Sequence, residues 1–335
     1  MKRSTFLKLA LAASVAPRAI AATGEGSRPR KLILIAGKPS HPPMMHEFRA
    51  GTILLEKRLK EVSGLIVERH ETGWVDDEKT FEDADAVVYY SDGNKRHPVL
   101  EEKGRIQTME NLVKRGVGFG CIHYGVEVPK DVAGEQFRDW MGGCYEAGFS
   151  CNPIWNAEIK KLPKHPITSG VKPFSILDEW YFNMRFAEGF DASEPKEVEG
   201  VKFTPILVAK PNDKARNGPY VYPKGPYPHI QEATGRDEAL MWSVERPDGG
   251  RGFGFTGGHF HQNWQNDDFR KTILNALCWI SNVNIPEGGV HSEPVSNEEL
   301  MLNLDDKKAR KKRAPKKQTK AKNKTPLKNI KHYRN

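Results

Sequence analysis

Four short apolar runs, each followed by a glycine or by polar loop residues, limit most strongly how this chain of 335 residues can fold. Residues 32–36 read Leu-Ile-Leu-Ile-Ala and stop at Gly37, and comparable runs lie within residues 65–69, 84–90 and 117–122. An apolar run without alternation is typical of a strand covered on both faces. Between the runs, apolar residues recur at helical spacing, as at Phe48, Leu55 and Leu59. This order predicts a parallel α/β sheet with right-handed crossovers and helices on both faces.

The second half of the chain is less regular. Residues 141–238 are rich in Pro, Gly and Asn, which predicts long loops that decorate the sheet. Short strands are expected near residues 154–159, 206–209 and 240–244. A final helix is expected after Asp267 and Asp268, with an apolar stripe through Phe269, Ile273, Leu277 and Ile280. We therefore expect one domain over residues 30–285.

The N-terminus has the composition of a targeting segment. Residues 1–21 combine positive charges at Lys2, Arg3 and Lys8 with a short apolar run and an Ala-Ile-Ala cleavage pattern. This predicts a signal peptide and a periplasmic or secreted protein, and Ser4 after Arg3 leaves the Sec and twin-arginine routes open. A disordered cytosolic N-terminus is the alternative. No segment reaches the ~20 apolar residues that a membrane span needs.

The positive charge is concentrated at the C-terminus. Residues 307–335 contain fourteen Lys and Arg and no Asp or Glu, so the formal net charge of +9 leaves about −5 for residues 1–306. A mildly acidic globular part argues against specific nucleic-acid binding by the fold. Residues 286–335 become polar and then Lys-rich, which predicts a disordered basic tail that contacts acidic polymers.

The cysteines show no disulfide framework. Cys121 and Cys278 lie in apolar strand and helix patterns, so both are expected to be buried thiols. An exported chain permits a bridge between Cys144 and Cys151 across a short loop, and two free thiols there are the alternative.

Histidines recur at the ends of three predicted strands. In an open parallel sheet, ligands bind beyond the carboxyl ends of the strands, so polar residues at these ends are candidates for one pocket. The candidates that follow the strands are His41, His46, Asp92, Asn94, His123, Glu127, His259 and His261.

Position 123 is informative about the reaction class. A glutamine amidotransferase-like sheet carries its nucleophilic cysteine on a tight strand-to-helix elbow, whereas the sequence here reads Ile122-His123-Tyr124-Gly125. Cys121 lies two residues earlier, inside the predicted strand. Without a thiolate at the elbow, thioester chemistry on glutamine is excluded.

His259 and His261 have the spacing that points two side chains the same way in an extended segment. Joined by His41 or His123 and a carboxylate, they would form a metal site with an open position. The alternative is that His259 orients a loop by hydrogen bonds while His261 faces solvent.

Two carboxylates and two aromatic residues are adjacent in Asp178-Glu179-Trp180-Tyr181. One carboxylate is a candidate general base, and the aromatic faces are candidates for stacking on a sugar ring, with Trp264 adding to that surface. Tryptophans in a domain of this size are usually in the core, so only one or two are expected at the pocket.

Several motifs in this order resemble the ThuA-like family, in the exported branch common in planctomycete-type bacteria. They are Ser40-His41, His46-Glu47-Phe48-Arg49-Ala50-Gly51, the residues 116–123, the residues 165–171, Asp178-Glu179-Trp180-Tyr181 and the residues 257–264. The resemblance implies a flavodoxin-like fold of the class I glutamine amidotransferase-like superfamily without its catalytic cysteine. It also implies a carbohydrate role, because relatives act beside sugar dehydrogenases on 3-keto-glycosides.

The resulting hypothesis is an exported enzyme that acts on a 3-keto-glycoside or a related small carbohydrate. A base is needed near the carbonyl, and His123, Glu179 or Asp178 would supply it. His41, His259 and His261 would polarise the carbonyl directly or through zinc or a similar divalent metal. Trp180, Tyr181, Trp264, Asp92 and Asn94 would bind the sugar. The alternatives are a non-catalytic carbohydrate-binding protein and a cell-surface protein whose tail grips acidic polymers.

Overall fold

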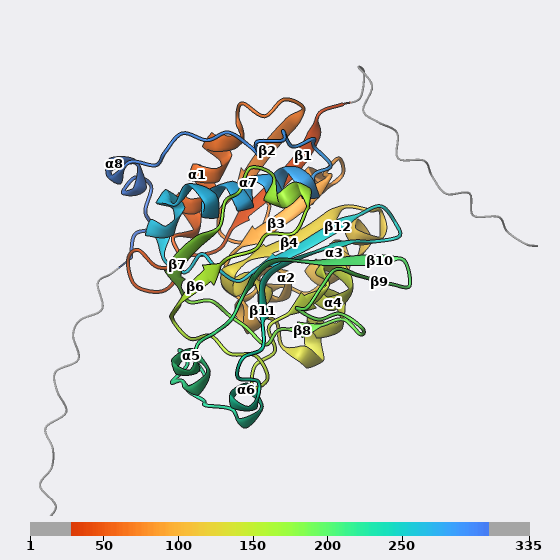
Figure 1. Cartoon of the computed structure of the whole chain (residues 1–335). Coiled ribbons are helices and arrows are strands. Elements are labelled where there is room, and N and C mark those ends of the chain that lie inside the picture. Colours follow the sequence, from red (N-terminus) through yellow and green to blue (C-terminus); the bar gives the residue numbers. More distant parts are fainter. Residues whose placement is uncertain (1–27, 308–335) are drawn as a thin grey trace, which may run out of the picture.

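A sheet of eight strands forms the centre of the computed structural model, which describes residues 28–307. The strands lie in the order β2-β1-β3-β4-β12-β11-β10-β9 (Figure 1). The first five are parallel: β2 (Leu65–His70), β1 (Arg30–Ala36), β3 (Ala86–Tyr90), β4 (Gly118–Ile122) and β12 (Arg251–Phe255). This half confirms the predicted α/β fold, and its order is that of flavodoxin-like sheets.

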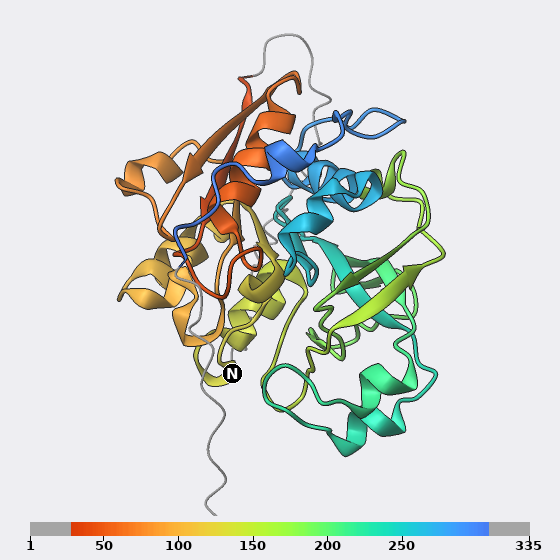
Figure 2. The same ribbon diagram turned by 90° about the vertical axis from the view of Figure 1, so that its left-hand side faces the viewer.

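Three further strands extend the same sheet in antiparallel pairing: β11 (Glu238–Glu245), β10 (Val201–Ala209) and β9 (Lys196–Val198). The sequence predicts parts of β10 and β11 but places them among decorating loops. That placement is wrong, because β11 pairs along its length with β12 and β10. Figure 2 shows this green half beside the orange and yellow parallel half.

Helices cover both faces of the sheet, as the continuous apolar runs predict. On one face, α1 (Phe48–Leu59) and α7 (Asp267–Ile280) share a hydrophobic core with Leu32 and Leu34 of β1. On the other face, α3 (Arg105–Lys114) and α4 (Glu135–Met141) share a core with Ile33 and Ile35. The inner strands of the parallel half are therefore buried on both sides, whereas the edge strand β2 is partly exposed.

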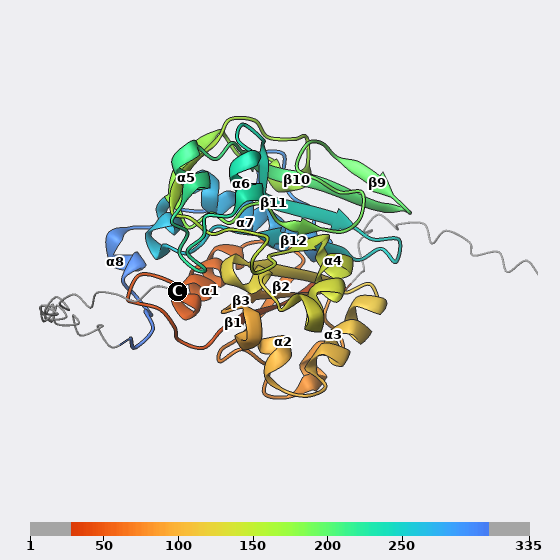
Figure 3. The ribbon, with the colours of Figure 1, turned by 90° about the horizontal axis from the view of Figure 1, so that it is seen from below.

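The remaining elements are short. Two small sheets pair β5 (Gly143–Cys144) with β8 (Arg185–Phe186) and β6 (Trp155–Ile159) with β7 (Phe174–Asp178). Viewed from below, α5 (Asp213–Asn217) and α6 (Pro228–Glu232) lie on the opposite side of the molecule from α2 (Pro98–Glu101) and α3 (Figure 3). The single turns are η1 (Glu78–Phe81), η2 (Asn94–Arg96), η3 (His123–Val126), η4 (Lys130–Gly134), η5 (Pro166–Thr168) and η6 (His261–Gln265).

The segment after residue 285 differs from the predicted disordered tail. Val290, Val295 and Leu300 are buried against the domain, and α8 (Asn297–Leu300) forms within this segment. Lys307 has a side chain only 4% exposed, close to Glu47. Residues 286–307 are thus part of the globular unit, because three of their apolar side chains and Lys307 pack against it, although Met301 and Leu302 are exposed. The predicted signal peptide and residues 308–335 lie outside the described residues.

Within residues 28–307, none of the helices has the length and apolar character needed to cross a membrane.

Candidate metal centre

The strand-to-helix elbow has the predicted position. His123 directly follows β4 and has a left-handed backbone, with φ 55°, where the strand turns into η3. Cys121 is fully buried inside β4. Among the described residues all four cysteines are free and buried, so Cys144 and Cys151 are not bridged. The elbow therefore presents an imidazole in place of a thiol.

Two loops far apart in the chain pair beside this elbow. Met45 and Phe260 form an antiparallel β-bridge, and the backbone N–H of His46 donates to the carbonyl of His259 at 3.0 Å. His46 also has a left-handed backbone, with φ 51°, which turns its side chain toward the sheet edge. As a result His46 Nε2 lies 2.9 Å from His259 Nδ1.

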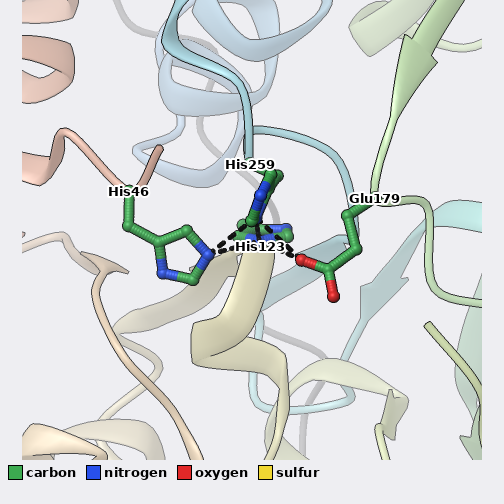
Figure 4. A group of neighbouring side chains, drawn as sticks. All are labelled: His46, His123, Glu179 and His259. Atoms are coloured by element: carbon green, nitrogen blue, oxygen red, sulfur yellow. Dashed lines mark hydrogen bonds and ion pairs between the residues drawn. The ribbon is translucent and has the colours of Figure 1, made fainter. Parts of the chain in front are cut away.

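Four buried side chains converge at this point: His46, His123, Glu179 and His259 (Figure 4). His123 Nε2 lies 3.0 Å from His46 Nε2 and 3.3 Å from His259 Nδ1. Glu179 Oε2 lies 2.7 Å from His259 Nδ1 and 3.6 Å from His123 Nε2. One ligand atom from each residue thus lies within 4.8 Å of all the others.

The outer hydrogen bonds determine which imidazole nitrogens carry hydrogen. His123 Nδ1 donates to the carbonyl oxygen of Thr256 at 2.9 Å, because that oxygen can only accept. His46 Nδ1 lies 3.3 Å from Asp92 Oδ1 and donates to this carboxylate. The Nε2 atoms of His46 and His123 consequently present lone pairs to each other. Such an arrangement is repulsive unless a cation lies between the nitrogens.

The donor set fits a divalent metal. Neutral imidazoles and one carboxylate are the ligands of many zinc sites, and an outer carboxylate or carbonyl that accepts from the other ring nitrogen usually orients them. Ligand atoms at ~2.0–2.1 Å from a tetrahedral centre lie roughly 3.3 Å from one another. Five of the six separations, from 2.7 to 3.6 Å, fall on both sides of that value, and the sixth, between His46 and Glu179, is within 4.8 Å.

The charges of the cluster agree with this chemistry. Burial, together with the neighbouring imidazoles of His123, His41 and His259, places the pKa of His46 well below its usual value, so its ring is neutral at neutral pH. Burial alone would raise the pKa of Glu179, but the neighbouring imidazoles of His123 and His259 lower it to about 2. A carboxylate with so low a pKa suits a ligand better than a general base.

Asp178 has a positioning role in the structure. Its carboxylate accepts the backbone N–H groups of Glu179, Gly258, His259 and Phe260 at 2.7 to 3.3 Å. It therefore fixes the loop that carries His259 relative to Glu179. With every oxygen directed at backbone donors and no exposed surface, it is not placed to transfer protons, which corrects the catalytic role proposed from the sequence.

Several other predicted site residues lie at the rim of the cluster. The Tyr181 hydroxyl is 3.3 Å from His123 Nε2. Asp92 contacts His46, and His41 stacks on the ring of His46 at 3.6 Å between centroids, so His41 lies beside the cluster instead of within it. Asn94 takes no part in the cluster and donates to Glu127 at 2.6 Å.

Three predicted site residues are not brought to the cluster. His261 begins η6, so the segment is not extended there, and its Nε2 donates to the carbonyl of Leu300 at 3.0 Å. Trp180 and Trp264 are both fully buried and pack against Phe269, so neither offers a face to a sugar. These three assignments are wrong. Sequence reasoning missed His46 as a ligand, although it identified the histidine pair to which it belongs.

Comparison with known proteins supports the fold. The family model described as ThuA, trehalose utilisation, matches residues 41–280. A ThuA-like protein from Bacteroides uniformis is similar over 78% of this chain and 97% of its own, with a TM-score of 0.52 and 12% identity. A ThuA-like protein from Parabacteroides merdae is similar over 79% and 93%, with a TM-score of 0.50 and 15% identity. None of the curated proteins matches the chain.

Proposed function

The chain belongs to the ThuA family of trehalose utilisation, and on this premise we propose that it is a carbohydrate-processing enzyme that holds a divalent metal at His46, His123, Glu179 and His259. The family supports a carbohydrate-related role. The observation that carries the proposal is the convergence of imidazole lone pairs and one carboxylate oxygen, which is unfavourable in a protein without a cation.

The substrate that we propose is a 3-keto-glycoside or a related oxidised sugar. A keto group acidifies the neighbouring C–H bonds, so isomerisation or β-elimination needs a proton acceptor and polarisation of the carbonyl oxygen. A bound metal would supply that polarisation. The Tyr181 hydroxyl, 3.3 Å from His123 Nε2, would donate a hydrogen bond to a substrate oxygen at the cluster.

His123 is not the base in this proposal. Its Nδ1 donates to Thr256 and its Nε2 faces the cluster, so both nitrogens are engaged. Glutamine amidotransfer is not proposed, because the thiol of Cys121 is buried in β4 and burial places its pKa well above the usual value.

One observation favours a second candidate function, a non-catalytic carbohydrate-binding protein. The four cluster residues are each 5% exposed or less, so the metal would stabilise the fold while sugars bind at the rim. Export through the N-terminal segment and contact of the basic C-terminal residues with acidic polymers remain part of the proposal, and they rest on composition alone.

Metal analysis of the purified full-length protein, followed by a screen of 3-keto-glycosides, tests the function. We expect about one divalent ion per chain, loss of turnover on chelation and recovery when the ion is restored. Bound metal without turnover of any keto-glycoside, combined with sugar binding, would favour the carbohydrate-binding alternative. Absence of both metal and turnover would contradict the proposed enzymatic function.

A further inference from the structure

Glu127 lies just beyond the elbow, four residues after His123, and takes no part in the cluster. Its side chain is largely buried, with the residue 8% exposed. Asn94 Nδ2 donates to Glu127 Oε1 at 2.6 Å, whereas Oε2 has no hydrogen-bond partner among residues 28–307. One carboxyl oxygen is thus held and the other is available.

The backbone around Glu127 is fixed from two sides. The Asn94 N–H donates to the carbonyl of Glu127 at 2.7 Å, and a side chain at Gly93 would lie 2.0 Å from the carbonyl oxygen of Tyr124, so the loops after β3 and β4 are in close contact. On the other side, Glu127 forms a parallel β-bridge with Tyr145. The carboxyl group therefore has a defined position at the carboxyl edge of the sheet.

Tyr145 provides an independent sign that a ligand belongs here. Its hydroxyl is buried and has no hydrogen-bond partner within the described part of the chain. Its ring packs on that of Tyr181 with 5.2 Å between centroids, and the Tyr181 hydroxyl reaches His123. A buried hydroxyl without a partner is costly, so its retention is explained if a substrate oxygen completes its hydrogen bond.

The two glutamates beside the elbow differ in charge state. In the metal-free protein burial raises the pKa of Glu127 to about 7, against the hydrogen bond from Asn94, and the negative charge of Glu179 adds to this effect. The titratable groups that face it are Glu179, Tyr124, Tyr145, Tyr181 and Tyr227. When two carboxyl groups in one site have well separated pKa values, the group with the lower pKa usually stays charged and the other carries the proton.

We propose that Glu127 is the proton carrier of this site, acting on a substrate that hydrogen-bonds to Tyr145. The proposal rests on the proposed function and deepens it. The Glu127 carboxylate takes the proton from the carbon next to the keto group, and the C–H electron pair moves into the carbonyl to give an enolate. Glu127 then returns the same proton, either to the former carbonyl carbon, as the neighbouring hydroxyl passes its proton to the enolate oxygen and becomes the new carbonyl, or to the glycosidic oxygen as its bond to carbon breaks.

Glu127→Gln tests the proposal, because glutamine keeps an oxygen for Asn94 but carries no proton. We expect wild-type metal content and sugar binding, with kcat lower by about 10²- to 10⁴-fold. Glu101→Gln, on the same edge of the sheet, is the matched control and should keep full activity. Tyr145→Phe should raise KM and leave metal content unchanged. Wild-type kcat in Glu127→Gln would overturn the assignment.

A second measurement does not depend on turnover. Infrared difference spectra between acid and alkaline pH should show a protonated carboxyl band that titrates near neutral pH and is absent from Glu127→Gln. In Asn94→Ala the titration should move to higher pH, because the hydrogen bond that favours the carboxylate is lost. If the band titrates like an exposed glutamate, Glu127 is not the proton carrier, whatever the outcome of the keto-glycoside screen.

Discussion

His46 Nε2 lies 3.0 Å from His123 Nε2, although 77 positions separate the two residues in the chain. Both have left-handed backbone conformations, with φ 51° and 55°. Such conformations cost about 1–3 kcal/mol each for residues other than glycine. They persist because the β-bridge between Met45 and Phe260 and the end of β4 determine the path of the backbone. The two imidazoles are therefore held in place before any ligand arrives.

Removing a cluster imidazole should remove the metal. In His123→Ala and in His259→Ala we expect bound metal to fall to background, because each variant loses one of four convergent donors. Metal content by mass spectrometry and circular dichroism together separate loss of the site from loss of the fold. His70→Ala, at the end of β2 and paired with Glu68, is the control and should bind metal normally.

Asp178→Asn should weaken metal binding although residue 178 is not one of the proposed ligands. In the wild-type protein, backbone N–H groups of this loop donate to the Asp178 carboxylate. The side-chain NH2 group of asparagine would face some of these N–H groups and could not accept from them, so the loop carrying His259 would lose its anchor. Loss of an orienting group of this kind costs about 10- to 100-fold in metal affinity. Competition with a chromophoric chelator measures it. Asp237→Asn, on an exposed side chain, should leave the affinity unchanged.

His97 should make the protein sensitive to acid. Burial lowers the pKa of His97 to about 3 from 6.5, so the unfolded chain binds a proton that the folded chain does not bind between these pH values. The free energy of unfolding therefore falls as the pH drops below 6.5, by about 2 kcal/mol for this group at pH 5.

The matching variant is His97→Asn, because asparagine can still cap α2 by accepting the Val99 N–H. Urea unfolding of the metal-free proteins at pH 7 and pH 5 should show a smaller loss of stability in the variant. An equal loss in both proteins would show that His97 is protonated in the folded state.

Lys307→Met should destabilise the protein. The Lys307 ammonium donates to the carbonyls of Met45 and His46 at 2.6 and 2.9 Å and lies 3.2 Å from Glu47. Removing one partner of a buried pair leaves the other charge unpaired, which costs about 3–5 kcal/mol. Chemical denaturation measures the change, with exposed Asp306→Ala as the control. A silent Lys307→Met would mean that Glu47 finds another partner.

Cys121→Ser should retain activity. The thiol is fully buried, lies 3.8 Å from His97 Nε2 and takes no part in the cluster. The substitution should therefore cost only about 1 kcal/mol of stability. Turnover after treatment with a thiol-modifying reagent should match that of untreated protein. Abolished turnover with an intact fold would restore a nucleophilic cysteine to consideration.

Local pattern predicts the parallel half of the sheet well, because β1, β3 and β4 are continuous apolar runs, which are typical of doubly covered strands. The same reasoning places His123 at the elbow. It does not reveal that β10 and β11 join this sheet, since strand pairing depends on partners distant in sequence.

The sequence alone could not show which of two neighbouring histidines belongs to the cluster, for the same reason. Whether His41 or His46 points into the cluster depends on a left-handed backbone and a bridge to residue 260. The prediction that His261 is a metal ligand is wrong because η6 begins at this residue, so the segment is not extended as the prediction assumed. Trp180 and Trp264 belong to the core, as tryptophans in such domains usually do.

The insertion of β12 between β4 and β11 has a consequence for the order in which the molecule forms. A chain made from its N-terminus has His46, His123 and Glu179 long before residue 259, and His259 comes into place only when β12 has entered the sheet. Contacts at such separation form late, because the closing of long loops precedes any gain from them. The cluster is therefore completed only in a nearly finished protein, so an incomplete or misassembled chain would lack a full ligand set and could not retain an ion.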